Sequence, residues 1–163
     1  MSEVEAKQTL SFCEENFGYN YFSLMVPPFV PRSILILGYG NGTVHRLIQK
    51  IWPYDVVVTG VDLVDPPDYS SDMVFVPGDA GKFVRECKSE YDYVVVDLFQ
   101  GKVIPPFVFS DDFVDGLGRI CVKLLGINCT FYRWDDFACY DRRFSIDCVK
   151  QVNHDKVLMF NPK

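Results

Sequence analysis

The chain has 163 residues, 48% of them apolar and 23% charged, with a formal net charge of −6. This length and composition predict one globular folding unit and exclude a disordered or fibrous chain. The acidic balance argues against a nucleic-acid partner, because no basic patch is visible to neutralise phosphates. No apolar run approaches the length of a membrane span, so we expect no membrane partner.

Cysteine and histidine spacing gives no sign of a metal site. The six cysteines form no CxxC pair, and the two histidines do not cluster with them. The first residues, MSEVE, lack the basic and apolar regions of a secretion signal. We therefore expect a cytoplasmic protein with reduced thiols and no metal.

Short apolar runs alternate with longer mixed stretches along the chain. Continuous apolar strands are typical of a parallel sheet that is covered on both faces. The predicted strands are Ser33–Leu37, Val56–Val61, Met73–Val76, Tyr93–Val96, Ile127–Tyr132, Phe144–Val149 and Lys156–Phe160.

Three of the intervening stretches show helical spacing: Thr43–Trp52, Ala80–Cys87 and Asp111–Leu125, the last with Ser110 as its N-cap. This alternation predicts an α/β fold with a doubly wound, mostly parallel, seven-stranded Rossmann-like sheet. The last two strands are joined by about five residues, too few for a crossover helix. They should therefore form an antiparallel pair at the C-terminus.

The aromatic segment Phe17–Val30 precedes the first predicted strand. We divide the chain into an N-terminal cover, residues 1–30, and a Rossmann-like domain, residues 31–163. The segment is interpreted first as a cover packed on the sheet edge. A homodimer contact or a lid over a ligand pocket are the alternatives.

The strongest local signal is the loop after the first strand, GYGNGT at residues 38–43. Glycine there permits positive φ and lets a ligand touch the backbone. A dinucleotide fingerprint would read G-x-G-x-x-G, whereas the third glycine here comes one residue early. The loop therefore favours a nucleoside such as S-adenosylmethionine over NAD.

Three aspartates follow the second, third and fourth predicted strands, at the edge where open α/β sheets bind their ligands. Asp62 can accept hydrogen bonds from both ribose hydroxyls, or it is a solvated turn residue. Asp79 can cap the following helix, accept a hydrogen bond from an adenine amino group, or do both. Asp97 can act as a general base or orient an acceptor, or it caps the next loop.

These elements, in this order, resemble the spermidine synthase branch of the class I S-adenosylmethionine-dependent methyltransferase superfamily. The resemblance covers about residues 21 to 132 and is clearest at YDYVVVDLF (91–99), IPP (104–106) and FS (109–110). It implies that the glycines cradle the cofactor, that the acid after the second strand binds the ribose, and that Asp97 faces the transferred group. The candidate cofactor-binding residues are Gly38, Gly40, Asn41, Gly42, Asp62, Leu63, Asp79 and Ala80.

The sequence also departs from the pattern of the aminopropyltransferases in that branch. They carry an N-terminal strand-rich domain, which about 30 residues cannot build, and acidic residues where this chain has Ser23, Asn41 and Gln100. We therefore expect methyl transfer from S-adenosylmethionine to a small-molecule acceptor. A decarboxylated S-adenosylmethionine-dependent aminopropyltransferase and a non-catalytic nucleoside-binding or assembly module are the alternatives.

Overall fold

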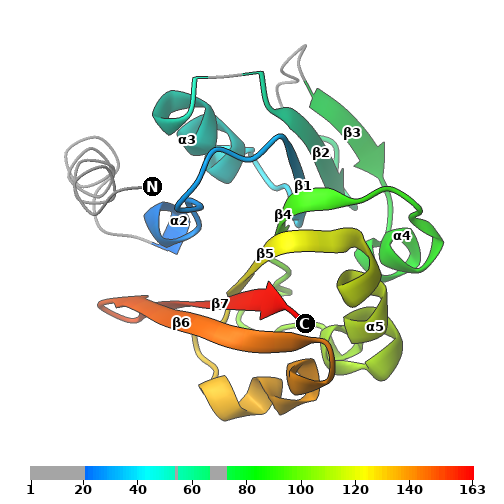
Figure 1. The fold of residues 1–163 in the computed structure, drawn as a ribbon, viewed down its shortest axis with the longest axis vertical. Coiled ribbons are helices and arrows are strands. Elements are labelled where there is room, and N and C mark those ends of the chain that lie inside the picture. Colours follow the sequence, from blue (N-terminus) through cyan, green and yellow to red (C-terminus); the bar gives the residue numbers. More distant parts are fainter. Residues whose placement is uncertain (1–20, 54, 67–72) are drawn as a thin grey trace.

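The computed structural model describes residues 21–53, 55–66 and 73–163 of the chain. Their centre is one seven-stranded sheet with the order β3-β2-β1-β4-β5-β7-β6 (Figure 1). The strands are β1 Ser33–Leu37, β2 Val57–Asp62, β3 Met73–Pro77, β4 Tyr91–Val96, β5 Cys121–Asn128, β6 Phe144–Val152 and β7 Asp155–Pro162.

The first five strands run parallel, and β7 lies antiparallel between β5 and β6. The turn between β6 and β7 is Asn153-His154, with Asn153 in the left-handed region at φ 54°. This arrangement confirms the predicted fold class and the antiparallel pair at the C-terminus.

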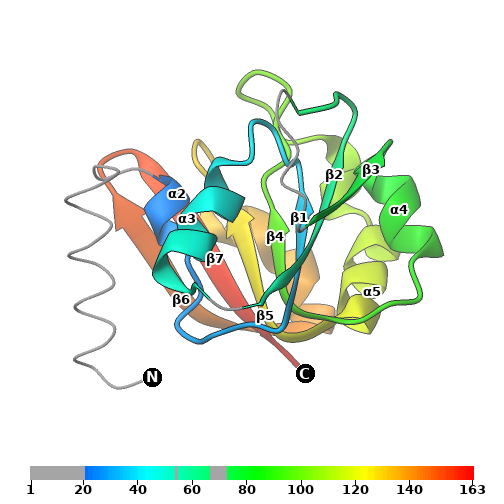
Figure 2. The same cartoon turned by 90° about the horizontal axis from the view of Figure 1, so that it is seen from above.

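Helices cover both faces of the sheet (Figure 2). The helix α2 Tyr21–Leu24 and the helix α3 Thr43–Ile51 lie on one face, and α4 Ala80–Glu86 and α5 Asp111–Ile120 on the other. Two 3-10 helices, η1 Pro106–Phe109 and η2 Trp134–Arg142, pack beside α5.

The run SILIL in β1 explains why both faces need cover. Ile34 and Ile36 join the core on the α2–α3 face, while Leu35 and Leu37 join the core on the α4–α5 face. All four are buried, and each such side chain contributes about 1.5–3 kcal/mol through burial. A strand with this pattern is stable only in the middle of a two-sided fold.

The predicted helix Asp111–Leu125 is wrong in its last third, residues 121–125. The helix α5 ends at Ile120, and β5 begins at Cys121 with no loop between them. Leu124 and Leu125 instead pair with Tyr93 and Val94 of β4. The gain from completing the sheet outweighs the helical pattern of the sequence.

The predicted strand Ile127–Tyr132 is wrong after its second residue. Only Ile127 and Asn128 belong to β5. After Asn128 the chain leaves the sheet in a turn closed by the Tyr132 N–H, which donates to the Cys129 carbonyl over 2.9 Å. Phe131 in this turn has a φ of 75°.

The part of the cover segment that the structure describes, residues 21–30, packs against α3, β6 and β7. Its backbone is hydrogen-bonded to the sheet by the buried Tyr93 and the half-buried Lys150. The Tyr93 hydroxyl donates to the Met25 carbonyl over 2.6 Å, and Lys150 Nζ donates to the Leu24 carbonyl over 3.2 Å. Residues 1–20 of the predicted cover lie outside the described residues, and the division at residue 30 stays a prediction.

In the described ranges, every helix is too short or too polar to cross a lipid bilayer.

Candidate functional site

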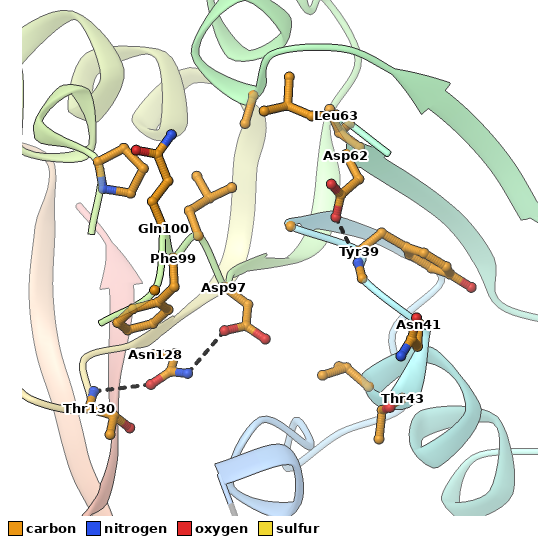
Figure 3. A pocket seen from close by; sticks show the side chains of 18 of the residues that line it. Tyr39, Asn41, Thr43, Asp62, Leu63, Asp97, Phe99, Gln100, Asn128 and Thr130 are labelled. Atoms are coloured by element: carbon orange, nitrogen blue, oxygen red, sulfur yellow. Dashed lines mark hydrogen bonds between the residues drawn. The ribbon is translucent and has the colours of Figure 1, made fainter. Parts of the chain in front are cut away.

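A pocket of about 610 Å³ opens at the carboxyl edge of the parallel strands (Figure 3). The residues that line it follow the five parallel strands, which lie side by side in the order β3-β2-β1-β4-β5. Because β7 runs the other way, it contributes its first residue, Asp155, to the same edge. This is the position at which open α/β sheets bind their ligands.

The three loop glycines all have positive φ but differ in surroundings. A Cβ at Gly38 would lie 2.1 Å from the carbonyl oxygen of Asp97, so this glycine lets β1 and β4 approach each other. A Cβ at Gly42 would lie 2.6 Å from the Tyr39 hydroxyl, and Gly42 does not line the pocket. Gly40 lines the pocket with nothing within 4 Å of an added Cβ. Gly40 is thus the glycine whose bare backbone faces the empty space.

Tyr39 anchors the glycine loop, and sequence reasoning missed this role. Its ring is 7% exposed and packs over Gly60 of β2, where a Cβ would come within 2.4 Å of the ring. Its hydroxyl lies 2.8 Å from Nδ1 of His45 in α3. The sequence shows both partners, Tyr39 between two glycines and Gly60 in the second predicted strand, but only the pairing of β1 with β2 brings them into contact.

Asp62 joins the first two loops. Its Oδ2 accepts a hydrogen bond from the Gly40 N–H over 2.7 Å, and its Oδ1 accepts one from the Val64 N–H over 3.3 Å (Figure 3). Leu63 follows at the pocket rim and is 70% exposed. The carboxylate is therefore fixed beside the open backbone of Gly40.

Asp79 caps α4, as the sequence predicts for one of its two roles. Its Oδ1 accepts a hydrogen bond from the Lys82 N–H over 2.7 Å. Asp79 and the buried Ala80 both line the pocket. The Phe107 ring closes this side, since it lies 3.1 Å from the position of a Cβ on Gly81.

Asp97 lies across the pocket from Asp62, directly after β4 (Figure 3). Its N–H donates to the Leu37 carbonyl over 2.8 Å, and its Oδ1 accepts a hydrogen bond from Asn128 Nδ2 over 3.0 Å. The Thr130 N–H donates to Asn128 Oδ1 over 3.0 Å. Because the amide oxygen is occupied in this way, the amide N–H₂ must face the carboxylate. Asn128, which is 4% exposed, was missed in the sequence analysis.

The half of the pocket beside β4, β5 and β7 combines aromatic and acidic side chains. Phe22, Phe99 and Phe131 line it together with Asp97 and Asp155. No lysine, arginine or histidine lines the pocket within the described residues. Among the described lining residues the acidic side chains therefore outnumber the basic ones, which makes the pocket acidic.

The thiol next to Asn128 is not part of this chemistry. Burial raises the pKa of Cys129 to about 11, against a smaller opposing effect from Lys156. Cys129 does not line the pocket. Among the described residues the site thus offers carboxylates, amides and backbone groups, and no thiol.

Comparison with known proteins finds similarity in the fold alone. No family model matches the sequence, and no curated protein matches it either. Solved structures do match. A 1,6-didemethyltoxoflavin methyltransferase from Burkholderia thailandensis, with its substrate and S-adenosylhomocysteine bound, is 14% identical with a TM-score of 0.64. The match covers 99% of this chain and 80% of that one.

Two further solved structures share the fold. The spermidine synthase of Thermotoga maritima is 16% identical with a TM-score of 0.63, over 88% of this chain and 59% of that one. A methyltransferase of Podospora anserina, with S-adenosylhomocysteine bound, is 12% identical with a TM-score of 0.57. The match covers 100% of this chain and 89% of that one. The chain therefore has the fold of class I methyltransferases and spermidine synthases, and it spans about three fifths of the Thermotoga enzyme.

Proposed function

We propose that this protein binds S-adenosylmethionine and transfers its methyl group to a small-molecule acceptor. The observation that carries the proposal is the position of three groups around one pocket. The open backbone of Gly40 and the carboxylate of Asp62 lie on one side, and the carboxylate of Asp97 on the other.

The residues present fit the parts of this cofactor. A Cβ at Gly40 would project into the empty space that a nucleoside needs. Asp62 would accept hydrogen bonds from the ribose hydroxyls, and Leu63, Asp79 and Ala80 line the region for the adenine. The carboxylate of the amino-acid tail would meet the N-terminus of α3, which begins at Thr43, because a helix N-terminus attracts anions without a basic side chain.

The cofactor, when bound, supplies a methyl group that its positively charged sulfur activates; this group bonds to the acceptor as the carbon–sulfur bond breaks and leaves a neutral thioether. The protein's task is to align the acceptor and to exclude water. Asp97 would hold the acceptor nucleophile and take its proton. Asn128 would keep the Asp97 carboxylate in the orientation that faces the pocket.

Aminopropyl transfer from decarboxylated S-adenosylmethionine is the second candidate. The absence of a lining lysine or arginine, within the described residues, favours a cofactor without a carboxylate. Two neutral residues weigh against it, since Asn41 and Gln100 line the pocket where the resemblance expects acids. A non-catalytic binding module is the third candidate and predicts binding without turnover.

Calorimetry tests these candidates directly. The protein is titrated with S-adenosylmethionine, S-adenosylhomocysteine, decarboxylated S-adenosylmethionine, methylthioadenosine and NAD. We expect the adenosyl thioethers and S-adenosylmethionine to bind and NAD not to bind. Binding of NAD alone, or of none of the five, would refute the proposal. Tighter binding of the decarboxylated form would favour the second candidate.

A further inference from the structure

The half of the pocket beside β4, β5 and β7, which the proposed function assigns to the acceptor and which we call the acceptor half, contains a carboxylate that no described residue neutralises. Asp155 begins β7 and lines the pocket. Within the described parts of the chain, its side chain accepts no hydrogen bond and forms no ion pair. By contrast, Asp62, Asp79 and Asp97 each accept a hydrogen bond. An uncompensated carboxylate in a concave site attracts cations and disfavours anions.

Three aromatic rings line the pocket together with this carboxylate and Asp97. Phe22 comes from α2, Phe99 from the loop after β4, and Phe131 from the turn after β5. Phe131 is 62% exposed although its ring is large and apolar, and its backbone has the φ of 75° that side chains rarely adopt. Lys102 contacts its ring, with Nζ 5.5 Å from the centroid, but does not line the pocket. An exposed ring held in a strained turn at a pocket rim indicates a binding role rather than a packing role.

Building on the proposed function, we propose that the acceptor is an amine with one positive charge and a flat, apolar body. Asp155 draws the ammonium group into the acceptor half, and the rings of Phe99 and Phe131 hold the body. Asp97 receives the proton that the nitrogen must lose before it can act as a nucleophile. A carboxylate or phosphate on the acceptor would be repelled by both aspartates.

The same lining disfavours a second ammonium group. Because Asp155 and Asp97 both act on the reacting nitrogen, a second ammonium group would face the rings and the neutral side chains of Gln100, Asn128 and Thr130, among the described residues. A cation desolvated against these groups loses hydration energy without a charged partner in return. The aromatic rings partly compensate one cation, since each exposed cation–ring contact contributes about 0.5–1 kcal/mol.

The test measures binding, not turnover, with the protein saturated with S-adenosylhomocysteine. Four probes are titrated: 2-phenylethylamine, 2-phenylethanol, 3-phenylpropionate and putrescine. We expect the amine to bind about tenfold more tightly than the alcohol, the gain of a charge-assisted contact. The propionate should bind more weakly still. Equal affinity of amine and alcohol, or tighter binding of the propionate or of putrescine, would overturn the inference.

Two variants assign the effect to residues. Asp155→Asn should lower the affinity for 2-phenylethylamine about fivefold, leave 2-phenylethanol unchanged and leave S-adenosylhomocysteine binding intact. Asp112→Asn, which removes one charge from the exposed first turn of α5, is the matched control and should change none of these affinities. An equal loss in both variants would mean that net charge, not Asp155, attracts the amine.

Phe131→Gly tests whether the Phe131 ring contacts the acceptor. The variant should still fold, because glycine adopts the observed φ without strain. It should weaken 2-phenylethylamine binding severalfold and leave the melting temperature unchanged or higher. Unchanged amine affinity would remove Phe131 from the proposal. If S-adenosylhomocysteine does not bind the parent protein, the proposed function is wrong. If it binds but the amine, the alcohol and the propionate bind with equal affinity, only the proposed class of acceptor is wrong.

Discussion

Asn128 Nδ2 lies 3.0 Å from Oδ1 of Asp97, and this contact joins the ends of two neighbouring strands inside the pocket. We predict that Asn128→Leu leaves the Thr130 N–H without its acceptor and Asp97 without this donor. The free energy of unfolding should fall by about 1–3 kcal/mol, measured by urea denaturation. Methyl transfer should fall while S-adenosylhomocysteine binding is retained.

The chain provides a matched control for that variant. Asn161 Nδ2 donates to Asp147 Oδ1 over 3.1 Å, the same pair of groups on the exposed hairpin. Asn161→Leu should cost less than about 0.5 kcal/mol, because water replaces the lost contact. A loss as large as that of Asn128→Leu would show that burial does not set the value of the Asn128 contact.

Asp62→Ala should weaken S-adenosylhomocysteine binding tenfold or more, since charge-assisted hydrogen bonds to two ribose hydroxyls contribute about 1.5–3 kcal/mol. Calorimetry measures the change. Asp65→Ala, three residues along and exposed, is the control and should bind as the parent does. If the folded Asp62→Ala protein keeps its affinity, the ribose assignment is wrong.

The glycine loop gives a prediction that separates binding from folding. Gly40→Val should abolish nucleoside binding, since its side chain would occupy the pocket, while the cost to stability is limited to about 1–2 kcal/mol of backbone strain. Gly38→Val should instead disrupt the fold, because its Cβ would collide with the Asp97 carbonyl. Circular dichroism and calorimetry on both proteins check this.

A strain control is available at Asn153, which also has a positive φ, at 54°, but does not line the pocket. Asn153→Val should cost stability through backbone strain, as Gly40→Val does, and keep S-adenosylhomocysteine binding. Loss of binding in both variants would mean that strain alone, transmitted through the loops, is responsible.

The ion pairs between α5 and η2 predict a pH dependence of stability. The hydrogen bond from Arg143 is the main cause that lowers the pKa of Asp115, with Arg142 adding a smaller charge effect. A lowered folded-state pKa means that this stabilisation is present above the unfolded value, about pH 3.9, and is lost as the pH falls through the folded value. Asp115→Asn should therefore reduce the urea midpoint more at pH 6 than at pH 2.

Asp112→Asn serves as the control there, because Asp112 lies on the same helix and has no ion pair among the described residues. Its urea midpoint should match that of the parent at both pH values. A pH dependence of Asp115→Asn that equals the parent's would contradict the assignment.

We finally predict that the protein is not an efficient diamine aminopropyltransferase. Putrescine carries two ammonium groups, and the neutral Asn41 and Gln100 return little of their lost hydration energy. Methylthioadenosine release from decarboxylated S-adenosylmethionine and putrescine measures the activity. Turnover near one per second, a typical enzyme rate, would contradict this prediction.

The central strands and the ligand-binding edge of the sheet could be predicted from the sequence, because burial on both faces leaves a clear pattern of apolar residues. Runs such as SILIL can only be central strands, and a glycine loop after the first of them marks the ligand edge. The error at α5 has a physical origin. The buried residues of this region follow helical spacing without a break from the helix into the strand: Phe113, Val114, Leu117, Ile120, Cys121, Leu124 and Leu125.

Local periodicity therefore could not locate the end of α5, which is set by pairing with β4 far away in the sequence. The same limit hid two pocket residues. Asn128 was placed inside a predicted strand, and Asp155 in a turn-like stretch beside an antiparallel strand. Both reach the pocket only because of how strands align in space.

The antiparallel insertion of β7 has a consequence for how specificity could change in such a protein. The turn Asn153-His154 is followed directly by Asp155, which lines the pocket. The tip of the β6–β7 hairpin therefore lies at the pocket, while its two strands belong to the sheet. Hairpin tips tolerate insertions and replacements far better than strands do. A new tip sequence could thus exchange the acidic rim for a neutral or basic one and redirect the protein to another class of acceptor, with the nucleoside half untouched.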